Sequence, residues 1–585
     1  MVRKRNTMSN SANESTSSTA IVDYKSSVNV HHLPKKSKSD SSNGRYLLAN
    51  GMTRVHRILT PEEVAAGRKT RWMELEISGT IRNLSPNLWN HSHLTALFLN
   101  GNQLTRIPPQ ISQLSNLVVL DLSHNKLRSL PAEIGDMISL CHLYLNYNQL
   151  RVLPYEIGKL FRLQTLGLHG NPLSPEISKI YHEHNGTQKL LQFLLDHLAI
   201  NTHPPPDRHW IMARRIDRER PTATFTVMCY NVLCDKYATS NLYSYCPSWA
   251  LNWEYRKSAI LKEIRLYEAD IITLQEVETE QYRALFLPEL ENLGYAGIFS
   301  PKSRAKTMSE DERKYVDGCA IFWKTDKFEL EKEHLVEFTQ VAIAKAEGSE
   351  HMINRVMTRD NIALCAVLKL KENIYSNSSS MLAPPPHENV VGNPLVVCTA
   401  HIHWDPEFCD VKLVQTMMLT HELSKLLEEV GRQHRLNSQH VPTLICGDLN
   451  SLPNSGVYEF LTKGVISTSH LDLKGFRQEN CLQQLSSSLD AHSYSHKLRL
   501  EPAYDPSLLP FTNYTLDFKG IIDYIFGSQN LVKLGVLGPV DVEWFAQNKI
   551  LGCPHPHIPS DHIPLMAQYA VVPPQLLGRY SYSAL

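Results

Sequence analysis

The sequence lacks the features of three classes of protein: secreted proteins, membrane proteins, and proteins stabilised by disulfides or zinc. Its 11 cysteines are odd in number and form no Cys-x-x-Cys pair, which argues against a disulfide or zinc framework and for reduced thiols. No apolar run is long enough to span a membrane, and no apolar segment follows Met1. We therefore expect neither a membrane protein nor a secreted one, and the cytoplasm and nucleus remain as compartments.

An excess of charge of one sign is also absent, because Lys plus Arg and Asp plus Glu both number 59. A net charge of zero gives no long-range electrostatic attraction for nucleic acid, but it does not exclude RNA bound at a local site. The chain has 585 residues, and 42% of them are hydrophobic, enough for two or three globular domains.

The two ends of the chain read as tails. Residues 1–58 are rich in Ser, Asn and Thr and carry ten Lys or Arg against three Asp or Glu, which predicts a disordered basic arm. Basic clusters such as Arg3 to Arg5 suit a nuclear signal or a weak RNA contact, although a solvated tail is the preferred explanation. We assign residues 576–585 to a short C-terminal tail.

A repeat of 23 residues dominates the predicted domain 59–195, which begins with a helical segment at Thr60. Asparagine recurs at the same place in four units, each time after a pair of leucines, at Asn102, Asn125, Asn148 and Asn171. This is the pattern of a leucine-rich-repeat solenoid, with Leu75 and Ile77 as a degenerate first unit. The asparagines should satisfy backbone groups at the bends. The outward strand positions should form a concave face for a protein partner, at Ala96, Phe98, Val119, Asp121, His142, Tyr144, Thr165 and Gly167.

A proline-containing linker, residues 196–221, separates this array from a second domain, residues 222–575. Seven apolar or alternating segments predict its strands: 224–231, 270–276, 318–324, 361–370, 395–404, 441–450 and 521–526. Segments 253–268 and 410–430 have helical spacing, so helices should cover a pair of sheets. The polar inserts 373–393 and 478–510 read as loops. The predicted fold is thus α/β, a leucine-rich-repeat solenoid followed by a two-sheet α/β sandwich.

Polar side chains collect where these predicted strands end. Asp448 and Asn450 lie two residues apart, so in a continuing strand they share one face while Leu449 points into the core. An ordinary turn after the strand is the alternative for this short motif. The other strand ends and one late loop supply Asn231, Glu276, His401, His403, Asp523, Asp561 and His562. Each residue alone suits a cap or a buried hydrogen-bond partner, but together they form a rim that can hold a divalent cation and orient water at a phosphate.

These residues stand in motifs that resemble, in order, those of the endonuclease/exonuclease/phosphatase superfamily. The motifs are Cys229-Tyr230-Asn231, Leu274-Gln275-Glu276, His401-Ile402-His403-Trp404, Gly447-Asp448-Leu449-Asn450, Ile522-Asp523-Tyr524 and Ser560-Asp561-His562. With the repeats in front, and with Asp405-Pro406 and Asn513 to Gly520, the chain is similar to the leucine-rich-repeat poly(A) deadenylases of the carbon catabolite repressor (four)/NOT complex.

The resemblance implies a role for each residue. Glu276 would be the principal Mg²⁺ ligand with Asn231 beside it, and Asp448 and Asp561 complete the metal set of one or two ions. Asp448 and Asn450 would position or deprotonate the attacking water. His562, oriented by Asp523, would stabilise phosphoryl charge, and His401 would contact the scissile phosphate. Phe518 and Pro406 would sandwich or wedge an adenine base, although a structural role in the core suits Phe518 equally. Asn450 and Glu276 would also contact substrate.

The implied function is a Mg²⁺-dependent 3′-to-5′ exoribonuclease that shortens single-stranded poly(A) and releases 5′-AMP. The array would bind a second deadenylase subunit and, through it, the NOT scaffold. Two alternatives remain open: another phosphodiesterase or phosphatase of the same superfamily, and a protein whose leucine-rich repeats are its main function as an interaction scaffold.

Overall fold

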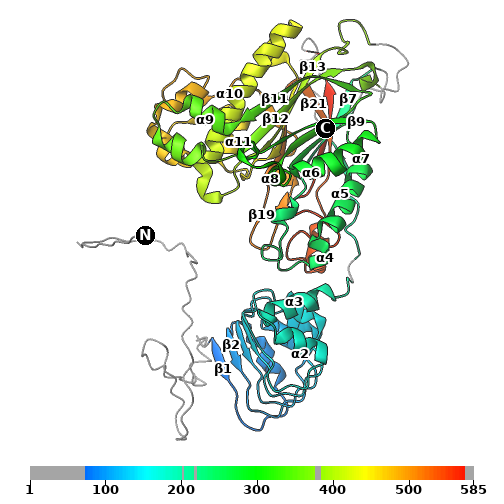
Figure 1. Ribbon diagram of the computed structural model, residues 1–585, viewed down its shortest axis with the longest axis vertical. Coiled ribbons are helices and arrows are strands. Elements are labelled where there is room, and N and C mark those ends of the chain that lie inside the picture. Colours follow the sequence, from blue (N-terminus) through cyan, green and yellow to red (C-terminus); the bar gives the residue numbers. More distant parts are fainter. Residues whose placement is uncertain (1–72, 201–202, 216–219, 376–383, 574–585) are drawn as a thin grey trace, which may run out of the picture. The chain divides into compact units, whose positions relative to one another are not determined.

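The computed structural model describes residues 73–200, 203–215, 220–375 and 384–573 (Figure 1). The chain divides into two compact units, residues 1–71 and 72–585, and the described residues all belong to the second. The predicted basic arm, the helical start at Thr60 and the C-terminal tail lie outside the described residues.

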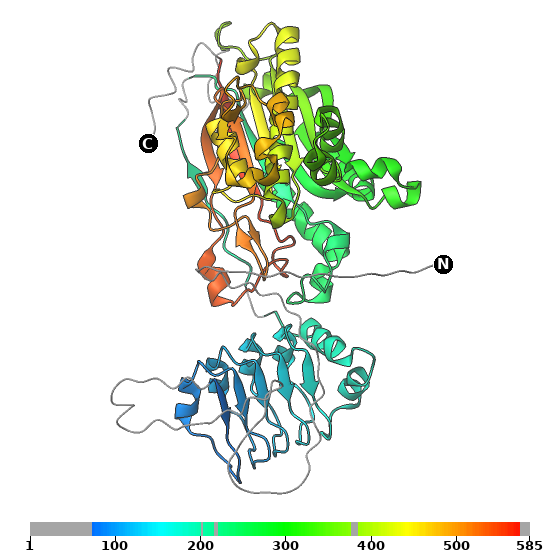
Figure 2. The same cartoon turned by 90° about the vertical axis from the view of Figure 1, so that its left-hand side faces the viewer.

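The repeats form one parallel sheet of five short strands, which confirms the solenoid. The strands are β1 (Glu74–Glu76), β2 (Ala96–Phe98), β3 (Val119–Asp121), β4 (His142–Tyr144) and β5 (Thr165–Gly167). They lie side by side in chain order (Figure 2). Short 3₁₀ helices return the chain between them, at Pro86–Asn90, Pro109–Gln113, Ala132–Asp136 and Tyr155–Lys159. Two helices, α2 (Pro175–Tyr181) and α3 (Gly186–Asp196), end the array.

The repeated asparagines bind backbone groups at the bends, as predicted. Asn125 Nδ2 donates to the carbonyl oxygens of Leu99 and Leu122 at 2.9 and 3.0 Å, and its Oδ1 accepts the Leu104 amide at 3.0 Å. Of the eight predicted outward positions, Ala96 and Gly167 are buried, and the other six are half-buried.

The second part of the chain contains two sheets. A seven-stranded sheet has the order β6 (Trp210–Met212), β21 (Leu531–Leu537), β22 (Leu565–Val571), β7 (Thr224–Asn231), β8 (Ile271–Glu278), β10 (Asp317–Lys324), β9 (Tyr295–Pro301). A six-stranded sheet has the order β11 (Phe328–Glu337), β12 (Ile362–Leu370), β13 (Pro394–His401), β14 (Thr443–Asp448), β20 (Asp523–Ser528), β17 (Leu500–Pro502). Short two-stranded ribbons are formed by β15 (Val465–Ser467) with β16 (Ser493–Ser495) and by β18 (Asn513–Tyr514) with β19 (Lys519–Gly520).

The two sheets share one core, and helices cover their outer faces (Figure 1). Successive side chains of β7 point to opposite faces of its sheet. Val227 and Cys229 face the second sheet, while Met228 and Tyr230 pack beneath α5 (Trp253–Tyr267). The 26-residue helix α10 (Cys409–His434) packs on the six-stranded sheet.

The remaining helices of this part are short. They are α4 (Ser248–Leu251), α6 (Thr279–Gln281), α7 (Leu287–Glu291), α8 (Glu310–Arg313), α9 (Phe338–Lys345), α11 (Gly456–Lys463) and α12 (Val542–Gln547), with π-helical turns at Tyr282–Phe286 and Met352–Val356. The two sheets with helices on their outer faces confirm the predicted two-sheet α/β sandwich.

All seven predicted strands exist, each with ends within three residues of the prediction. The prediction of a loop over 478–510 is wrong in part, because β16 and β17 lie there and β17 forms the edge of a sheet. Each is three residues long, too short to show alternation. The strand β6 lies within the predicted linker and pairs with β21.

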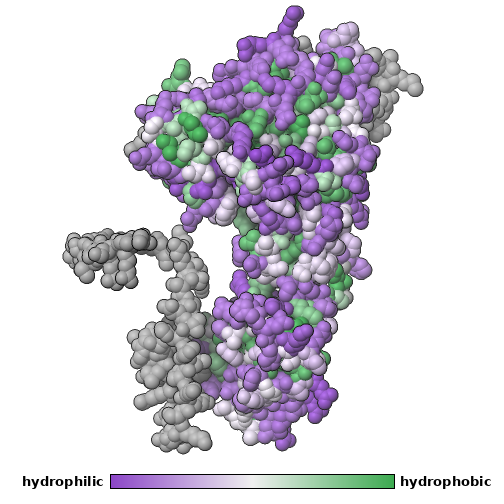
Figure 3. Space-filling model, in the orientation of Figure 1, coloured by the Kyte–Doolittle hydropathy of each residue, from purple (hydrophilic) through white to green (hydrophobic). Residues whose placement is uncertain are grey.

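No helix among the described residues has the length and apolar character needed to cross a membrane. The face in Figure 3 is mostly hydrophilic, and its hydrophobic residues form small separate groups.

Candidate active site

The polar residues predicted at strand ends meet at one edge of the two-sheet core. β7 runs parallel to β8, with Asn231 opposite Gln275, and β13 runs parallel to β14, with His401 opposite Asp448. β20 starts at this edge, so that Asp523 pairs with Asp448. Because carboxyl ends of neighbouring parallel strands share an edge, residues far apart in sequence become neighbours.

Asn231 links the carboxylates of the two sheets. Its Nδ2 lies 3.2 Å from Glu276 Oε1 and 3.0 Å from Asp448 Oδ2, so one amide group donates toward both acids. Its Oδ1 accepts the Leu233 amide at 3.0 Å, which fixes the side chain in this orientation. The residue is fully buried, and it therefore holds Glu276 and Asp448 at a set separation.

Glu276 lies in a β-bulge. The register of β8 and β10 shifts between Gly318 and Cys319, and Glu276 has a φ of 61°, in the left-handed region that glutamate rarely adopts. Its Oε2 accepts the Cys234 amide at 2.9 Å. Burial and the nearby charges of Asp317 and Asp561 raise the pKa of Glu276. A strained carboxylate among other acids is a typical feature of a binding site.

Asp448 ends β14, and the prediction that the strand continues through Asn450 is wrong. Asn450 has a φ of 47°, and its amide donates to Asp448 Oδ1 at 2.9 Å, so the segment is the turn that sequence offered as the alternative. The Asn450 side chain donates to the Ile402 carbonyl at 3.0 Å. Leu449 is buried, as predicted. The turn places Asp448 and Asn450 at the same edge by a route other than strand alternation.

His562 and Asp523 form a buried pair beside Asp448. His562 Nδ1 lies 2.9 Å from Asp523 Oδ2, and its Nε2 lies 3.6 Å from Asp448 Oδ2. Burial favours the neutral ring, but Asp523, Asp561 and Asp448 outweigh it and raise the pKa of His562 well above its usual value. Burial raises the pKa of Asp448 to about 7, against the opposing effect of His562. The pair can thus present an imidazolium to an anion while Asp448 accepts a proton near neutral pH.

Asp561 faces the same acid cluster and has one oxygen without a hydrogen-bond partner. Its Oδ2 accepts from Tyr243 Oη at 2.9 Å and from Asn513 Nδ2 at 3.2 Å, whereas its buried Oδ1 makes no hydrogen bond among the described residues. Such an oxygen, near the glutamate whose pKa it raises, suits a hard cation. Asp448, Asp523 and His562 also place ligand atoms within 4.8 Å of one another. The donors present therefore fit a divalent metal.

His401 completes this edge from β13. Its Nε2 lies 3.6 Å from Asp448 Oδ2, and its buried Nδ1 has no hydrogen-bond partner among the described residues. Burial and Lys302 lower the pKa of His401 well below its usual value, so the ring is neutral. His403, two residues on, is buried and points its ring toward Trp404 and Phe408.

Sequence reasoning missed a buried charge cluster next to these residues. Asp317, fully buried at the start of β10, pairs with Lys302 at 2.6 Å and Lys236 at 3.2 Å and also with Arg304. Although burial opposes it, these cations hold the pKa of Asp317 well below its usual value. The acid precedes the predicted strand 318–324 by one residue, and that position was the only available signal. Tyr243 lies in a loop without periodicity, so the sequence contains no signal for its role.

The two residues predicted to hold a base lie on separate surface segments. Phe518 is partly exposed between β18 and β19, and Pro406 begins the 3₁₀ helix Pro406–Phe408. The Phe518 amide donates to Thr515 Oγ1 at 3.1 Å, which closes the turn that presents the ring. Their contact with a base stays a prediction.

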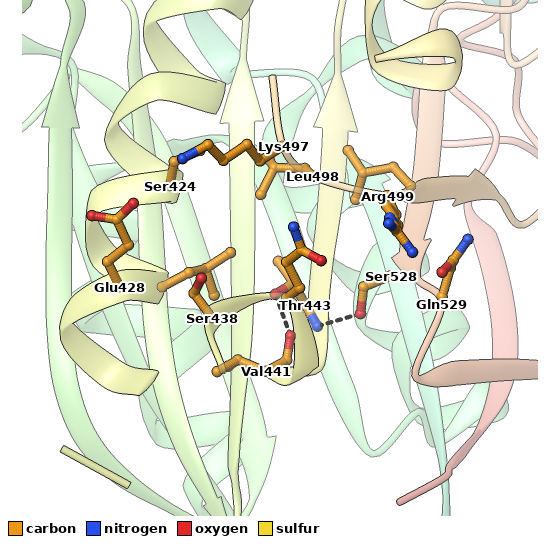
Figure 4. Close-up of a pocket in the computed structure, with 13 residues that line it drawn as sticks. Ser424, Glu428, Ser438, Val441, Thr443, Lys497, Leu498, Arg499, Ser528 and Gln529 are labelled. Atoms are coloured by element: carbon orange, nitrogen blue, oxygen red, sulfur yellow. Dashed lines mark hydrogen bonds between the residues drawn. The ribbon is translucent and has the colours of Figure 1, made fainter. Parts of the chain in front are cut away.

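A pocket elsewhere in this part of the chain is not the predicted site (Figure 4). It is lined by residues such as Lys497, Arg499 and Thr443, and Thr443 begins the strand that Asp448 ends. The pocket thus lies at the opposite end of β14 from the polar cluster.

Comparison with known proteins gives two family matches. Residues 228–562 match the endonuclease/exonuclease/phosphatase family, and residues 71–189 match a leucine-rich repeat region. The chain is 56% identical over 531 residues to "CCR4-NOT transcription complex subunit 6-like" of Danio rerio, covering 89% of this chain and 94% of that protein. It is 44% identical to "CCR4-Not complex 3'-5'-exoribonuclease subunit Ccr4" of Mycosarcoma maydis, covering 87% and 75%. Among solved structures, that of ANGEL2, a 2′,3′-cyclic phosphatase, is 26% identical with a TM-score of 0.48, covering 63% of this chain and 99% of that one.

Proposed function

The chain belongs to the endonuclease/exonuclease/phosphatase family, and from that premise we propose that it is a 3′-to-5′ exoribonuclease that shortens the poly(A) tails of messenger RNA and releases 5′-AMP. The observation that carries the proposal is the junction at Asp448, where one carboxylate lies beside an amide, a neutral histidine and a histidine with a raised pKa. Hydrolysis of a phosphodiester requires such a proton acceptor next to donors for the phosphoryl oxygens.

The residues divide the work as follows. Asp448 accepts a proton from water, the water oxygen bonds to phosphorus, and the bond from phosphorus to the 3′-oxygen of the preceding nucleotide breaks. That oxygen leaves in line with the attack and takes a proton from solvent, and no covalent enzyme intermediate forms. His562, held by Asp523 at 2.9 Å, donates to the phosphoryl oxygens where charge accumulates. His401 contacts the scissile phosphate, and Asn450 orients the water.

We assign a magnesium site to Glu276, Asp448 and Asp561, with Asn231, predicted as a further ligand, beside it and holding the first two acids through its amide nitrogen. Oxygen donors are the ligands that Mg²⁺ prefers, and the unpartnered Asp561 Oδ1 and the raised pKa of Glu276 both favour a cation at this edge. A bound divalent ion supplies Lewis-acid polarisation of the phosphoryl oxygen and lowers the pKa of water. Phe518 and Pro406 hold the adenine base by stacking.

The activity is tested with two 5′-labelled RNAs of equal length, one of adenosines only and one of mixed sequence, in Mg²⁺ or with EDTA. We expect a ladder of 3′-shortened oligo(A) in Mg²⁺, slower shortening of the mixed RNA, and no product with EDTA. An intact oligo(A) in Mg²⁺ would contradict the proposal. Release of inorganic phosphate from a terminal phosphate would instead assign the chain to the phosphatases of the family.

The array supports a second proposal, that its strand face binds another deadenylase subunit and through it the NOT scaffold, in the cytoplasm and the nucleus. Phe98, His142 and Tyr144 are half-buried side chains on that face, and aromatic residues are enriched at protein interfaces. Replacement of His142 and Tyr144 by alanine should lower co-purification of the subunit at least tenfold without changing hydrolysis. The matched control is Tyr155→Ala, an exposed tyrosine of a connecting 3₁₀ helix. Equal recovery with all variants would exclude this face.

A further inference from the structure

An aromatic and cationic surface lies directly beyond the catalytic edge, and we call its residues Trp404, Phe408, Arg355, Arg359 and Lys474 the Trp404 patch. Trp404 follows β13 by three residues and is 68% exposed, although it is among the largest apolar side chains. The guanidinium carbons of Arg355 and Arg359 lie 4.4 and 4.3 Å from the centre of the Phe408 ring. The rings of Trp404 and Phe408 both contact His403, and an exposed tryptophan and ring-stacked guanidinium groups offer the surfaces on which nucleic-acid bases stack.

The cations of the patch are placed by specific contacts. Arg355 binds both oxygens of the buried Asp410, at 2.7 and 2.9 Å, which fixes its plane against Phe408. Arg359 donates only through Nε, to the Arg355 carbonyl at 3.3 Å, and its terminal nitrogens make no hydrogen bond among the described residues. A guanidinium with free terminal donors is suited to a phosphate.

Lys474 is held in an unfavourable backbone conformation beside the same surface. Its φ of 46° and ψ of −118° interrupt a 3₁₀ segment, and its ammonium group donates to the Glu407 carbonyl. The next residue is Gly475, where a Cβ would lie 2.3 Å from His351 Nε2, so a larger residue there would displace that ring. A pocket of about 470 Å³ opens between these residues and Phe408. Strain of this kind persists where the surrounding structure enforces it, and it is common at ligand sites.

The patch is continuous with the catalytic edge. Lys412 donates to the Asn450 carbonyl at 2.7 Å, and the Asn450 side chain donates to Ile402, the residue before His403. The His403 ring lies 5.3 Å from Phe408 and 6.3 Å from Trp404. One hydrogen bond to the backbone of Ile402, and the ring contacts of the adjacent His403, therefore connect the Asp448 turn to the patch.

We propose that the Trp404 patch binds the single-stranded RNA upstream of the nucleotide being removed. This inference rests on the proposed function. A 3′-exonuclease holds the 3′ end of its substrate at the catalytic edge, and the rest of the strand extends from that edge in the 5′ direction. A base stacks on Trp404, and Arg359 and Lys474 contact backbone phosphates. Such contacts are made by long substrates only, so they raise the preference for a long tail over a short oligonucleotide.

The test compares kcat/KM for an RNA of twenty adenosines with that for triadenylate, at several salt concentrations. In the variant Trp404→Ala, the preference for the long RNA should fall about tenfold, the effect of losing one stacked base. In Arg359→Ala and Lys474→Ala, the slope of log kcat/KM against log salt should fall by about 0.7, as for one lost phosphate contact on a single strand. The matched controls are Leu489→Ala and Lys463→Ala, an exposed apolar and an exposed basic side chain of other segments.

Three results would contradict the proposal or the function on which it rests. An unchanged long-to-short preference and salt slope in all three patch variants, with melting curves equal to wild type, overturns the proposal. Loss of a co-purifying protein with RNA preference unchanged overturns it too and assigns the patch to a protein partner. If the wild type cleaves neither RNA, the proposed function has failed, and that result is distinct from both.

Discussion

The repeat array and the nuclease part bury polar groups in different ways. In the array, Asn125 binds backbone groups 3, 21 and 26 residues away, and its equivalents do the same in neighbouring repeats. In the nuclease part, Asn231 binds Asp448 over 217 residues, and the buried acids Asp317 and Asp523 pair with cationic or imidazole groups. The asparagine contacts of the array are copied by the next repeat, whereas each contact of the site occurs once.

The two regions therefore contribute differently: the polar groups of the array to stability, and those of the site to chemistry. The buried polar groups of the array are neutral and satisfied, so they contribute to stability through ordinary hydrogen bonds. The site retains unpartnered polar atoms and like charges in proximity, at Asp561, His401 and Glu276, which is unfavourable for folding and useful for chemistry. Loss of a site residue should therefore affect rate, and loss of an array asparagine should affect stability.

The largest effect should come from Asp448→Asn, which keeps the shape of the side chain but removes its capacity to accept a proton. We expect kcat on oligo(A) to fall about 1,000-fold, with circular dichroism and melting temperature unchanged or raised. The control is Asp490→Asn, an exposed acid in a surface turn. A variant with near-normal turnover would show that the proton acceptor lies elsewhere.

A smaller effect, on stability and not on rate, should come from Asn125→Ala. The substitution leaves the Leu99 and Leu122 carbonyls and the Leu104 amide without their partner, and we expect the array's free energy of unfolding to fall by about 3 kcal/mol. Denaturant titration measures it, and hydrolysis of oligo(A) should not change. Asn116→Ala serves as the control, since its single bond to Ser92 is exposed. A loss of turnover in Asn125→Ala would break the separation between the two regions.

The smallest effect concerns acid stability of the nuclease part. His496 is buried with both ring nitrogens bonded, to the Phe460 carbonyl at 2.8 Å and the Leu498 amide at 3.2 Å, and burial lowers its pKa to about 4. The unfolded chain, whose histidine pKa is about 6.5, therefore binds more protons between pH 6.5 and 4, and stability is lost as the pH falls through that window.

We expect wild type to lose about 2 kcal/mol from this residue between pH 7 and pH 5. His496→Gln should lose correspondingly less over the same interval, whatever its stability at pH 7, and His492→Gln, at an exposed position, should behave as wild type. Unfolding free energies at the two pH values provide the comparison. Parallel losses in wild type and His496→Gln would contradict the assignment.

Most of the fold could be predicted because it rests on local periodicity. The 23-residue repeat determines the array, and alternating or continuous apolar runs determine strands such as β7 and β12. Four of the longer strands, β9, β11, β21 and β22, were not predicted: β9 contains a glycine within it, and the exposed side of β11 carries charged residues. β9 and β11 lie at sheet edges, where one neighbour is missing and the apolar requirement is relaxed.

The site could be predicted as a set of residues but not as a geometry. Acids and amides at strand ends indicated which residues meet, since parallel strands share an edge. The turn at Asn450 was one of two structures that the sequence allowed, whereas the bulge at Glu276 and the cluster around Asp317 were not predictable, because each depends on contacts with strands distant in sequence. Lys302 illustrates the limit: a single lysine becomes a buried cation only when β10 brings Asp317 to it.

The bulge at Glu276 has a mechanical consequence. A regular strand can slip along its neighbours by two residues and recover an equivalent pattern of hydrogen bonds, but a residue with positive φ opposite a register shift has no equivalent position two residues away. β8 is therefore locked against sliding, and the carboxylate cannot drift away from Asn231 without melting of the strand. The position of the Glu276 carboxylate at this edge is therefore set by the backbone of β8.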